Sequence, residues 1–337
     1  MPKKKKARKI FGIIALSLVA LFVLSIIINS ITTHNNRKKI EDAYGEYYET
    51  SSGKMNYTII GEGDTSIVIL PGQGSISPHY EFLEIANRMS DDYKIIIIEP
   101  LGYGLSDDTN VERSAENVCN EIHEVLAFIG ENQYYIMGHS IAGLYALQYA
   151  NMYEDELLGF IGLDASIPAQ ISDESVSSKA MLLYPYKLFL VDTGVLRLSL
   201  MGIESAPDVL FDKPELQGTI MQCFRNLDSD NRTVLAELYV SRAQNRTMIN
   251  EVSMFDRNAN NEKTLSFPES VPVLYILSDE SVEDSPNWLE YHEELASNNP
   301  NSQVMVVDGN HYVHLSSEDE VIDITMDWMS CYTRTFQ

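Results

Sequence analysis

Short apolar runs alternate with longer helix-like stretches from Met55 almost to the end of this 337-residue chain. Most of the runs are four to six residues long, rich in Ile and Val, and bounded by Gly, Pro, Asp or Ser. Runs of this kind are typical of strands that are buried on both faces of a parallel sheet. They lie at residues 57–60, 66–70, 93–98, 134–137, 158–163, 272–277 and 303–307.

The stretches between the runs have helical patterns at residues 80–88, 115–129, 141–152 and 319–329. The alternation predicts an α/β fold with a mostly parallel sheet and helices on both faces. Between residues 165 and 269 it stops, and only helix-like segments (179–190 and 233–243) are present. We therefore expect one domain at residues 55–334 that carries a helical lid at about 169–266, with the sheet resuming afterwards.

Residues 10–31 contain no charged side chain and follow a terminal block with six Lys and Arg. A helix needs about 20 apolar residues to cross the hydrocarbon core of a bilayer. A cleaved signal peptide has a shorter apolar region, of roughly 7–15 residues, and a small-residue cleavage site, which is missing here. The segment is thus predicted to be an uncleaved transmembrane anchor; a signal peptide and a buried core helix are the alternatives.

The basic residues also predict the orientation of this anchor. Six precede the apolar segment, whereas only Arg37, Lys38 and Lys39 follow it closely. Basic residues are enriched on the cytoplasmic side of membrane spans. We expect a single-pass cell-membrane protein with a cytoplasmic tail (1–9), a polar spacer (32–54) and an extracellular domain.

The formal net charge of −25 limits the partners of the chain. A surface this acidic disfavours binding to nucleic acid and to anionic lipid head groups. The three cysteines, Cys119, Cys223 and Cys331, are far apart and fit neither a metal-ligand spacing nor a dense disulfide framework. No metal or organic cofactor is expected.

The strongest motif is Gly138-His139-Ser140-Ile141-Ala142-Gly143, which follows one apolar run and opens a helix-like stretch. A nucleophile at such a strand-to-helix turn is held in a strained conformation and requires small residues on either side. Gly138 and Ala142 meet that requirement. The turn also places Ser140 at the positive end of a helix, where a developing oxyanion is stabilised. Ser140 is therefore the predicted nucleophile.

With this motif in place, residues 57–328 resemble the α/β-hydrolase superfamily, and the lid is expected after the sixth strand of that fold. The sequence Leu70-Pro71-Gly72-Gln73-Gly74-Ser75 stands where the family has a strand followed by His-Gly-x-Gly. The resemblance implies an oxyanion hole formed by the backbone N–H groups of Gln73 and Ile141. The segment 99–107 is similar to the family's D-x-R-G-x-G-x-S loop, with Glu99 and Leu101 as departures, and is interpreted as structural.

His311 follows the last apolar run and precedes the C-terminal helix, where the family keeps its catalytic base. His314 occupies the place of a second, structural histidine. The sequence offers two places for the acid. One place is the loop after residues 272–277, which contains Asp279 and Glu280, although the family's acid falls nearest Ser281. The other is Asp164 at the end of the preceding strand, where lipases similar to the pancreatic type carry their acid. We slightly favour Asp164 and keep Glu280 and Asp279 as alternatives.

The resemblance implies a serine hydrolase, similar to a carboxylesterase or lipase, that cleaves a small or acyl ester through an acyl-enzyme. With the apolar segment at residues 10–31, it is expected to be membrane-anchored. Ser at the turn, rather than Asp, argues against epoxide hydrolysis. One alternative is a peptidase or amidase of the proline iminopeptidase type, but the His-Gly-Gly-Pro-Gly loop of that type and its Trp at the nucleophile turn are missing. The other is a non-catalytic surface protein that keeps the fold. The Leu, Met and Tyr residues of the lid, such as those at 181–190, either cover an acyl pocket or form the core of the lid itself.

Overall fold

The computed structural model describes residues 2–169, 176–199, 227–242, 245–285, 287–297 and 299–333. Its centre is an eight-stranded sheet in the order β1-β2-β4-β3-β5-β6-β7-β8. All neighbours from β4 to β8 pair in parallel, whereas β2 runs antiparallel to both β1 and β4. The strands are β1 (Glu46–Thr50), β2 (Gly53–Ile60), β3 (Ser66–Leu70), β4 (Lys94–Glu99), β5 (Tyr134–His139), β6 (Leu157–Leu163), β7 (Val273–Ser278) and β8 (Gln303–Val307).

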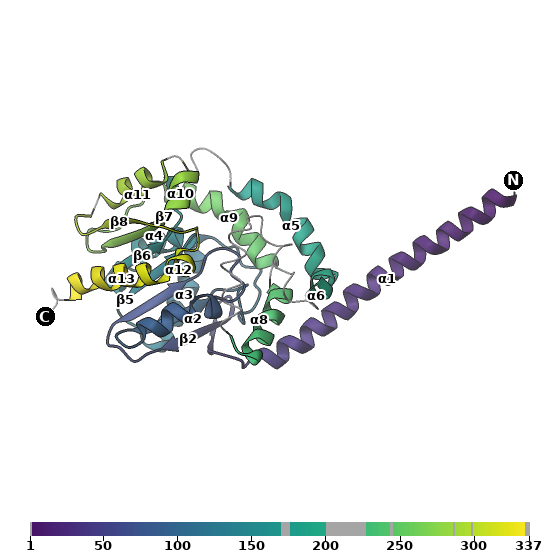
Figure 1. Ribbon diagram of the computed structural model, residues 1–337, viewed down its shortest axis with the longest axis horizontal. Helices are drawn as coiled ribbons and strands as arrows, with labels where there is room; N and C mark the ends of the chain where they lie inside the picture. The colour runs from purple at the N-terminus through teal and green to yellow at the C-terminus, as the bar shows by residue number, and fades with distance from the viewer. Residues whose placement is uncertain are drawn as a thin grey trace.

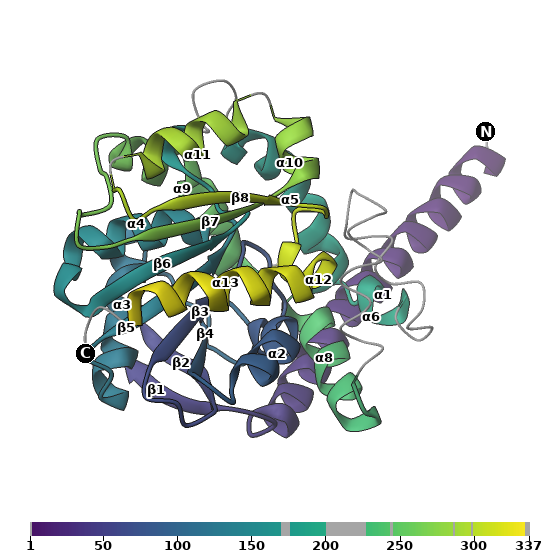
Figure 2. The same cartoon turned by 60° about the vertical axis from the view of Figure 1, so that its left-hand side comes forward.

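Helices cover both faces of the sheet, as Figure 2 shows with α13 crossing one face. Residues of α2 and α13 share a core with alternate strand residues such as Ile69 and Met137. The other strand residues, such as Val68 and Ile136, face α3, α4 and α11. These helices and the short ones near them are α2 (Pro78–Met89), α3 (Ala115–Ile129), α4 (Ala142–Met152), η1 (Glu154–Glu156), α10 (Asp279–Asp284), α11 (Trp288–Ala296), α12 (Val313–Ser316) and α13 (Glu318–Thr333). The predicted α/β-hydrolase fold is thereby confirmed, and all seven predicted strands are present within a few residues of their expected bounds.

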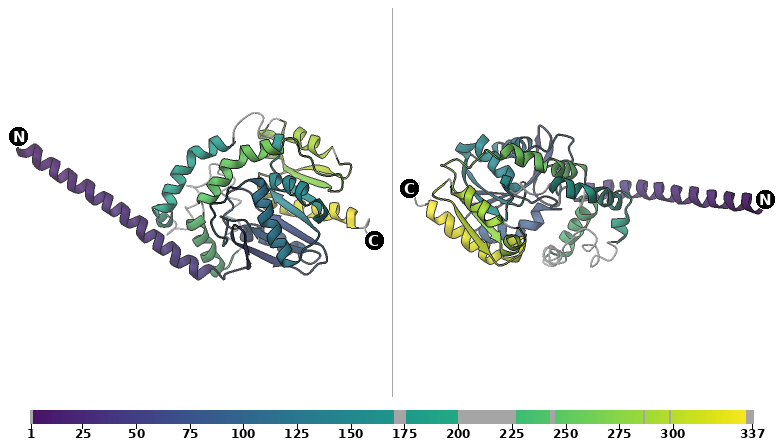
Figure 3. Two further views of the ribbon diagram at one scale, coloured as in Figure 1. Left: turned by 180° about the vertical axis from the view of Figure 1, so that it is seen from behind. Right: turned by 90° about the horizontal axis from the view of Figure 1, so that it is seen from above.

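The lid lies between β6 and β7, where the sequence predicts it. Its described helices are α5 (Val176–Asp192), α6 (Val195–Ser199), α8 (Ser229–Arg242) and α9 (Arg246–Glu262). They gather at one end of the body, on the side from which the N-terminal helix projects (Figure 1, Figure 3). Met201, Met221 and Cys223, which belong to the predicted lid, lie outside the described residues.

Helix α1 (Pro2–Ile40) extends away from the body (Figure 1). Its segment Arg8–Ile40 is long and apolar enough to cross a membrane, with a mean hydropathy of 3.0 in its most apolar window and none of that window buried. This is the length and composition of either a membrane anchor or a signal sequence.

The segment 32–54 differs from the polar spacer expected there. Its first residues continue α1 to Ile40, and Glu46–Thr50 form β1, which pairs with β2 in a hairpin. The sheet thus begins at residue 46, before the expected start of the domain at residue 55. The reason is that β1 is a partly exposed edge strand, so its Tyr and Glu side chains lack the apolar run that marks a buried strand.

Candidate functional site

Ser140 lies at the turn between β5 and α4 in a left-handed backbone conformation, with φ of 51°. Its N–H donates to the carbonyl of Leu163 (3.2 Å), and its own carbonyl accepts from the N–H of Ser166 (2.7 Å). A side chain at Gly143 would collide with the carbonyl of Ser166, so the start of α4 approaches the end of β6 as closely as backbones allow. Because a non-glycine residue is costly at such a φ, the surrounding structure holds Ser140 in this strained turn.

His311 lies between Ser140 and Asp164 and contacts both. Its Nε2 atom is 3.1 Å from Oγ of Ser140, and its Nδ1 atom is 2.8 Å from Oδ2 of Asp164. Ser140 is thereby joined to a buried carboxylate through one imidazole ring. These are the contacts that a nucleophile, a general base and an orienting acid require.

Asp164 is fully buried at the end of β6 and accepts several hydrogen bonds. Its donors besides His311 are the hydroxyls of Ser278 (3.0 Å) and Ser281 (2.5 Å) and the indole N–H of Trp288 (3.0 Å). Burial by itself raises the pKa of this carboxyl, but the hydrogen bond and charge of His311, together with the Ser281 and Trp288 donors, hold it below its usual value. Asp164 is therefore ionised at neutral pH.

The two alternative acids have other positions. Asp279 accepts the N–H of Gly309 (2.9 Å) and the N–H of Glu280 (2.9 Å), which joins the loop after β7 to the loop that carries His311. Glu280 donates its own N–H to the Gly309 carbonyl (3.4 Å). Both ring nitrogens of His311 contact Ser140 and Asp164, so neither nitrogen is left for an alternative carboxylate.

Ser140 and His311 line a cavity of about 330 Å³, and both predicted oxyanion-hole residues, Gln73 and Ile141, line it with them. In the part of the chain that the structure describes, the N–H groups of Gln73 and Ile141 have no hydrogen-bond acceptor. Gly72 packs directly against His139 and Ser140, which holds the loop close to the nucleophile. Two amides therefore remain available for a negatively charged oxygen formed at Ser140.

Three further elements that the sequence did not single out contribute to the walls of the cavity. Val252 and Phe255 come from the lid helix α9, Trp288 from α11, and Tyr312 from the loop after His311. A cavity of this size is at the lower end of the range for small-molecule sites, roughly 300–1,000 Å³. The lid therefore forms one wall of the site rather than a separate surface.

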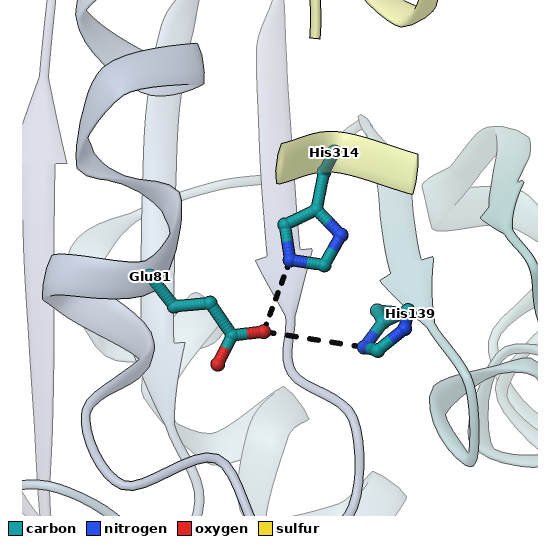
Figure 4. Close-up of side chains that lie close together, drawn as sticks. All are labelled: Glu81, His139 and His314. Carbon is teal, nitrogen blue, oxygen red and sulfur yellow. Dashed lines mark hydrogen bonds and ion pairs between the residues drawn. The ribbon is translucent and has the colours of Figure 1, made fainter. Parts of the chain in front are cut away.

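Behind the nucleophile lies a buried cluster of Glu81, His139 and His314 (Figure 4). Oε1 of Glu81 is 3.0 Å from Nε2 of His314 and 4.0 Å from Nδ1 of His139. Glu81 also accepts the hydroxyl of Ser75 (2.5 Å), and Nε2 of His139 is 2.9 Å from the carbonyl of His311. Of these three residues, only His314 was predicted from the sequence to have a structural role. Glu81 was not predicted because it lies in an ordinary helix.

Burial sets the charge of this cluster. It lowers the pKa of His314 to about 3, holds the pKa of His139 well below its usual value, and raises the pKa of Glu81. Their donor atoms lie close enough to hold a small metal ion. However, the neutral imidazoles already donate to Glu81 and to the His311 carbonyl. The hydrogen bonds of this cluster join the loop at residues 70–75, through Ser75, to the loops that carry Ser140 and His311.

Comparison with known proteins agrees with this geometry. A family model described as alpha/beta hydrolase fold matches residues 65–318. The chain is 24% identical to the Uncharacterized protein YbdG of Bacillus subtilis (strain 168), over 95% of this chain and 97% of that protein. It is 28% identical to a Proline iminopeptidase of Clostridium botulinum, over 39% of this chain and 45% of the relative. An epoxide hydrolase mutant from Vigna radiata has a similar fold, with a TM-score of 0.59 and 14% identity over 85% of this chain and 98% of that structure.

Proposed function

Because the chain belongs to the α/β-hydrolase fold family, we propose that it is a membrane-anchored serine hydrolase that cleaves a carboxylic ester. One observation carries the proposal: His311 contacts Ser140 with one ring nitrogen and the ionised Asp164 with the other, at the wall of a cavity. A chain that had lost catalysis would have no need to keep this alignment together with a strained Ser140.

In the proposed reaction, Oγ of Ser140 attacks the ester carbonyl while Nε2 of His311 takes its proton. Asp164 accepts the Nδ1–H of His311, so the lone pair of Nε2 faces Ser140 and the imidazolium that forms is stabilised. His311 then returns the proton to the leaving alkoxide, which leaves an acyl group on Ser140. Water, deprotonated by the same His311, hydrolyses that acyl-enzyme and regenerates the free hydroxyl.

The negative charge on the carbonyl oxygen in both steps is assigned to the N–H groups of Gln73 and Ile141. The second N–H lies at the N-terminus of α4, where the aligned peptide dipoles favour an anion. Loss of one such donor typically costs about 10²–10³ in rate. Because both donors are backbone groups, their positions depend on the neighbouring packing, in particular on Gly72 against His139.

A second candidate is amide or peptide hydrolysis by the same three residues. It is favoured by the partial similarity to a Proline iminopeptidase, which covers less than half of that relative. The two candidates differ in the leaving group, which is an alkoxide for an ester and an amine for an amide. The full-length protein should therefore be assayed on p-nitrophenyl esters of increasing chain length and on aminoacyl p-nitroanilides. Faster turnover of the anilides would replace the ester proposal with the amide one.

Labelling with a fluorophosphonate probe tests the nucleophile directly. We expect the purified full-length protein to be labelled at Ser140 and the Ser140→Ala variant to be unlabelled. Ser285→Ala is the matched control, because Ser285 lines the same cavity and should leave labelling unchanged. A folded wild-type protein that remains unlabelled would favour the non-catalytic alternative.

A further inference from the structure

The C-terminal part of α1 packs against the lid. The side-chain amide of Asn29 donates to the carbonyls of Val191 (2.9 Å) and Asp192 (3.3 Å), which lie at the end of α5. Arg197 of α6 donates to the side chains of Asn29 (3.2 Å) and Thr33 (2.9 Å), and it also pairs with Glu237 of α8 (2.6 Å). Both carbonyls belong to the last turn of α5, where the helix supplies no N–H partner of its own, although that of Val191 also accepts the N–H of Gly194 (3.1 Å). The Asn29 contact therefore holds the end of α5 beside α1.

A second contact lies further toward the N-terminus of α1. The rings of Phe22 and Phe189 are stacked, with their centroids 5.8 Å apart. Phe22 precedes Ile31, the last residue of the apolar segment, by nine positions, which is about 13 Å along a helix. The hydrocarbon core of a bilayer is about 30 Å thick. If α1 spans the membrane, Phe189 must therefore lie inside the hydrocarbon region as well.

The surface of α5 suits that position. Its inward side includes Tyr184 and Val191, which are buried in the lid. Leu182, Tyr186 and Phe189 follow one another at helical spacing along another side and are 83%, 58% and 47% exposed. Although α5 also carries Lys179, Lys187 and Asp192, it has apolar side chains on a buried and on an exposed side. A contiguous exposed apolar surface marks a site of contact with protein or membrane. Val195 and Leu198 of α6 extend the same exposed surface toward α1.

We propose that α5 and α6 are embedded in the outer leaflet of the bilayer beside α1, with lipid acyl chains covering the exposed surface formed by Leu182, Tyr186, Phe189, Val195 and Leu198. The end of α5 and helix α6 lie beside α1 in the views from behind and from above (Figure 3), and the stacked rings of Phe22 and Phe189 join the apolar segment of α1 to this lid surface. Acyl chains are the occupant that α1 itself requires, so one medium covers both surfaces. The inference rests on the anchoring part of the proposed function.

The position of the lid also indicates the substrate class. Helix α5 packs on α9, and α9 presents Val252 and Phe255 to the cavity beside Ser140. The wall of the active site is thus one helix away from the bilayer. A substrate that is itself dissolved in the membrane, such as an ester with a long acyl chain, reaches Ser140 by way of the lid without first entering water.

The test uses the full-length protein in phosphatidylcholine vesicles. Leu182→Trp places a fluorescent side chain on the proposed lipid-facing surface. Val306→Trp is the matched control, since Val306 is 42% exposed on the edge strand β8, on the side of the body away from the free end of α1 (Figure 1). The native Trp288 and Trp328 are buried, so the wild-type signal can be subtracted. We expect the Leu182→Trp emission to be blue-shifted and to be quenched by lipids brominated in the acyl chain, while Val306→Trp is neither.

Three outcomes would overturn the inference. In the first, the emission and quenching of Leu182→Trp match those of Val306→Trp, which places the lid in water. If that protein also floats with the vesicles and is labelled by fluorophosphonate, the hydrolase proposal remains intact. A blue shift without quenching means that protein, for example a second copy of the chain, covers the surface. Protein that alkaline extraction removes from the vesicles shows that α1 is no anchor. Tyr186→Trp, on the same side of α5, repeats the test if Leu182→Trp does not fold.

A second arm follows the substrate. The double variant Leu182→Asp, Tyr186→Asp places two carboxylates where a charge in hydrocarbon is costly. We expect it to lose most hydrolysis of a long-chain ester presented in the vesicles and to keep the rate of the wild type on a water-soluble short-chain ester. Equal losses on both esters, or no loss on either, would contradict entry through the membrane.

Discussion

At the scale of single residues, the acid of the proposed triad follows β6, the strand that the sequence favoured over β7. β6 and β7 are adjacent and parallel, so their carboxyl ends open at the same edge of the sheet. A carboxylate after either strand can therefore reach the loop of His311, which is why the sequence kept Glu280 and Asp279 as alternatives to Asp164. The structure places Asp164 against His311, and Ser281, at the position where the family's acid is expected, donates its hydroxyl to Asp164.

This arrangement predicts different effects for the three carboxylates. Asp164→Asn should lower kcat by about 10³–10⁴, since an amide no longer favours the required His311 tautomer or stabilises the imidazolium. Glu280→Gln is the matched control and should keep nearly full turnover on a p-nitrophenyl ester. The KM of Asp164→Asn should change little, because Asp164 is buried behind His311. An inactive Glu280→Gln beside an active Asp164→Asn would show that the acid is assigned to the wrong strand.

The candidate site was predictable where local sequence determines local geometry. The small residues around Ser140 indicate the turn, and Ser140, His311 and Asp164 all lie where the sequence placed them. Glu81 and the cavity residues of α9 were not predictable, because they reach the site through tertiary packing between distant segments. Ser75 and Glu81 show this well: their hydrogen bond involves an ordinary serine and an ordinary helical glutamate.

At the scale of elements, α9 is the part of the lid most firmly joined to the catalytic domain. The side chain of Asn245 caps its first turn and donates to the carbonyl of Gly102 (2.7 Å). Glu251, in its middle, accepts hydrogen bonds from Tyr145 (2.8 Å) and from Tyr103. These contacts hold Val252 and Phe255 at the cavity. We therefore expect any movement of the lid to involve α5 and α6 rather than α9.

Sequence analysis did not identify α9 as a helix. Met248, Val252, Phe255 and Ala259 follow a helical spacing, but their buried neighbours along the same side are polar. Glu251, Asn258 and Glu262 are all buried there. Because a buried polar group needs its partners from other segments, a single sequence gives no sign that such residues face inward.

Glu262, at the end of α9, gives a prediction about stability. It is fully buried, and in the described part of the chain neither of its carboxylate oxygens has a hydrogen-bond partner. Burial raises its pKa to about 9. The folded state thus keeps a proton that the unfolded state releases near pH 4–5. By linkage, this group leaves stability unchanged below that range and lowers it progressively as the pH rises toward 9.

Glu262→Gln removes the titration and keeps the shape of the side chain. It should raise the Tm at pH 8 by roughly 5 °C, a few kcal/mol in a domain of this size, and change it little at pH 4. Thermal unfolding followed by circular dichroism at both values measures the difference. Glu283→Gln, at an exposed site, is the control and should leave both Tm values unchanged. A Tm gain that is equal at both pH values would mean that the carboxyl of Glu262 does not titrate as the structure indicates.

At the scale of the whole molecule, the alternation of strands and helices was sufficient to predict the sheet, its parallel core and the lid. It failed at the N-terminal edge, where β1 lies outside the buried part of the sheet. It also gave no sign that α1 continues to Ile40 and packs on the lid. Residues 32–39 are polar, so only tertiary contacts such as Arg37 with the Ser106 carbonyl (3.4 Å) show that they belong to the body.

Because α1 continues into the body, the orientation of the proposed anchor determines on which side of the membrane the proposed enzyme lies. Six basic residues precede the apolar segment and three follow it closely, so the N-terminus should face the cytoplasm. Protease added to intact cells should then digest the hydrolase domain and leave an N-terminal fragment that contains the anchor. An N-terminal epitope tag should survive, and a cytosolic protein should remain intact as the control.

Variants of the same basic residues test whether the N-terminal charge determines the orientation. Substituting Lys3, Lys4, Lys5 and Lys6 with Asn leaves Arg8 and Lys9 before the apolar segment, against Arg37, Lys38 and Lys39 after it. Because basic residues near a span set its orientation, a fraction of the variant should insert with the domain inside and become protected from protease. The Lys3→Arg, Lys4→Arg, Lys5→Arg, Lys6→Arg variant keeps the charge and should remain fully digested. Complete digestion of both variants would mean that folding of the acidic domain outside the membrane, rather than the N-terminal charge, determines the topology.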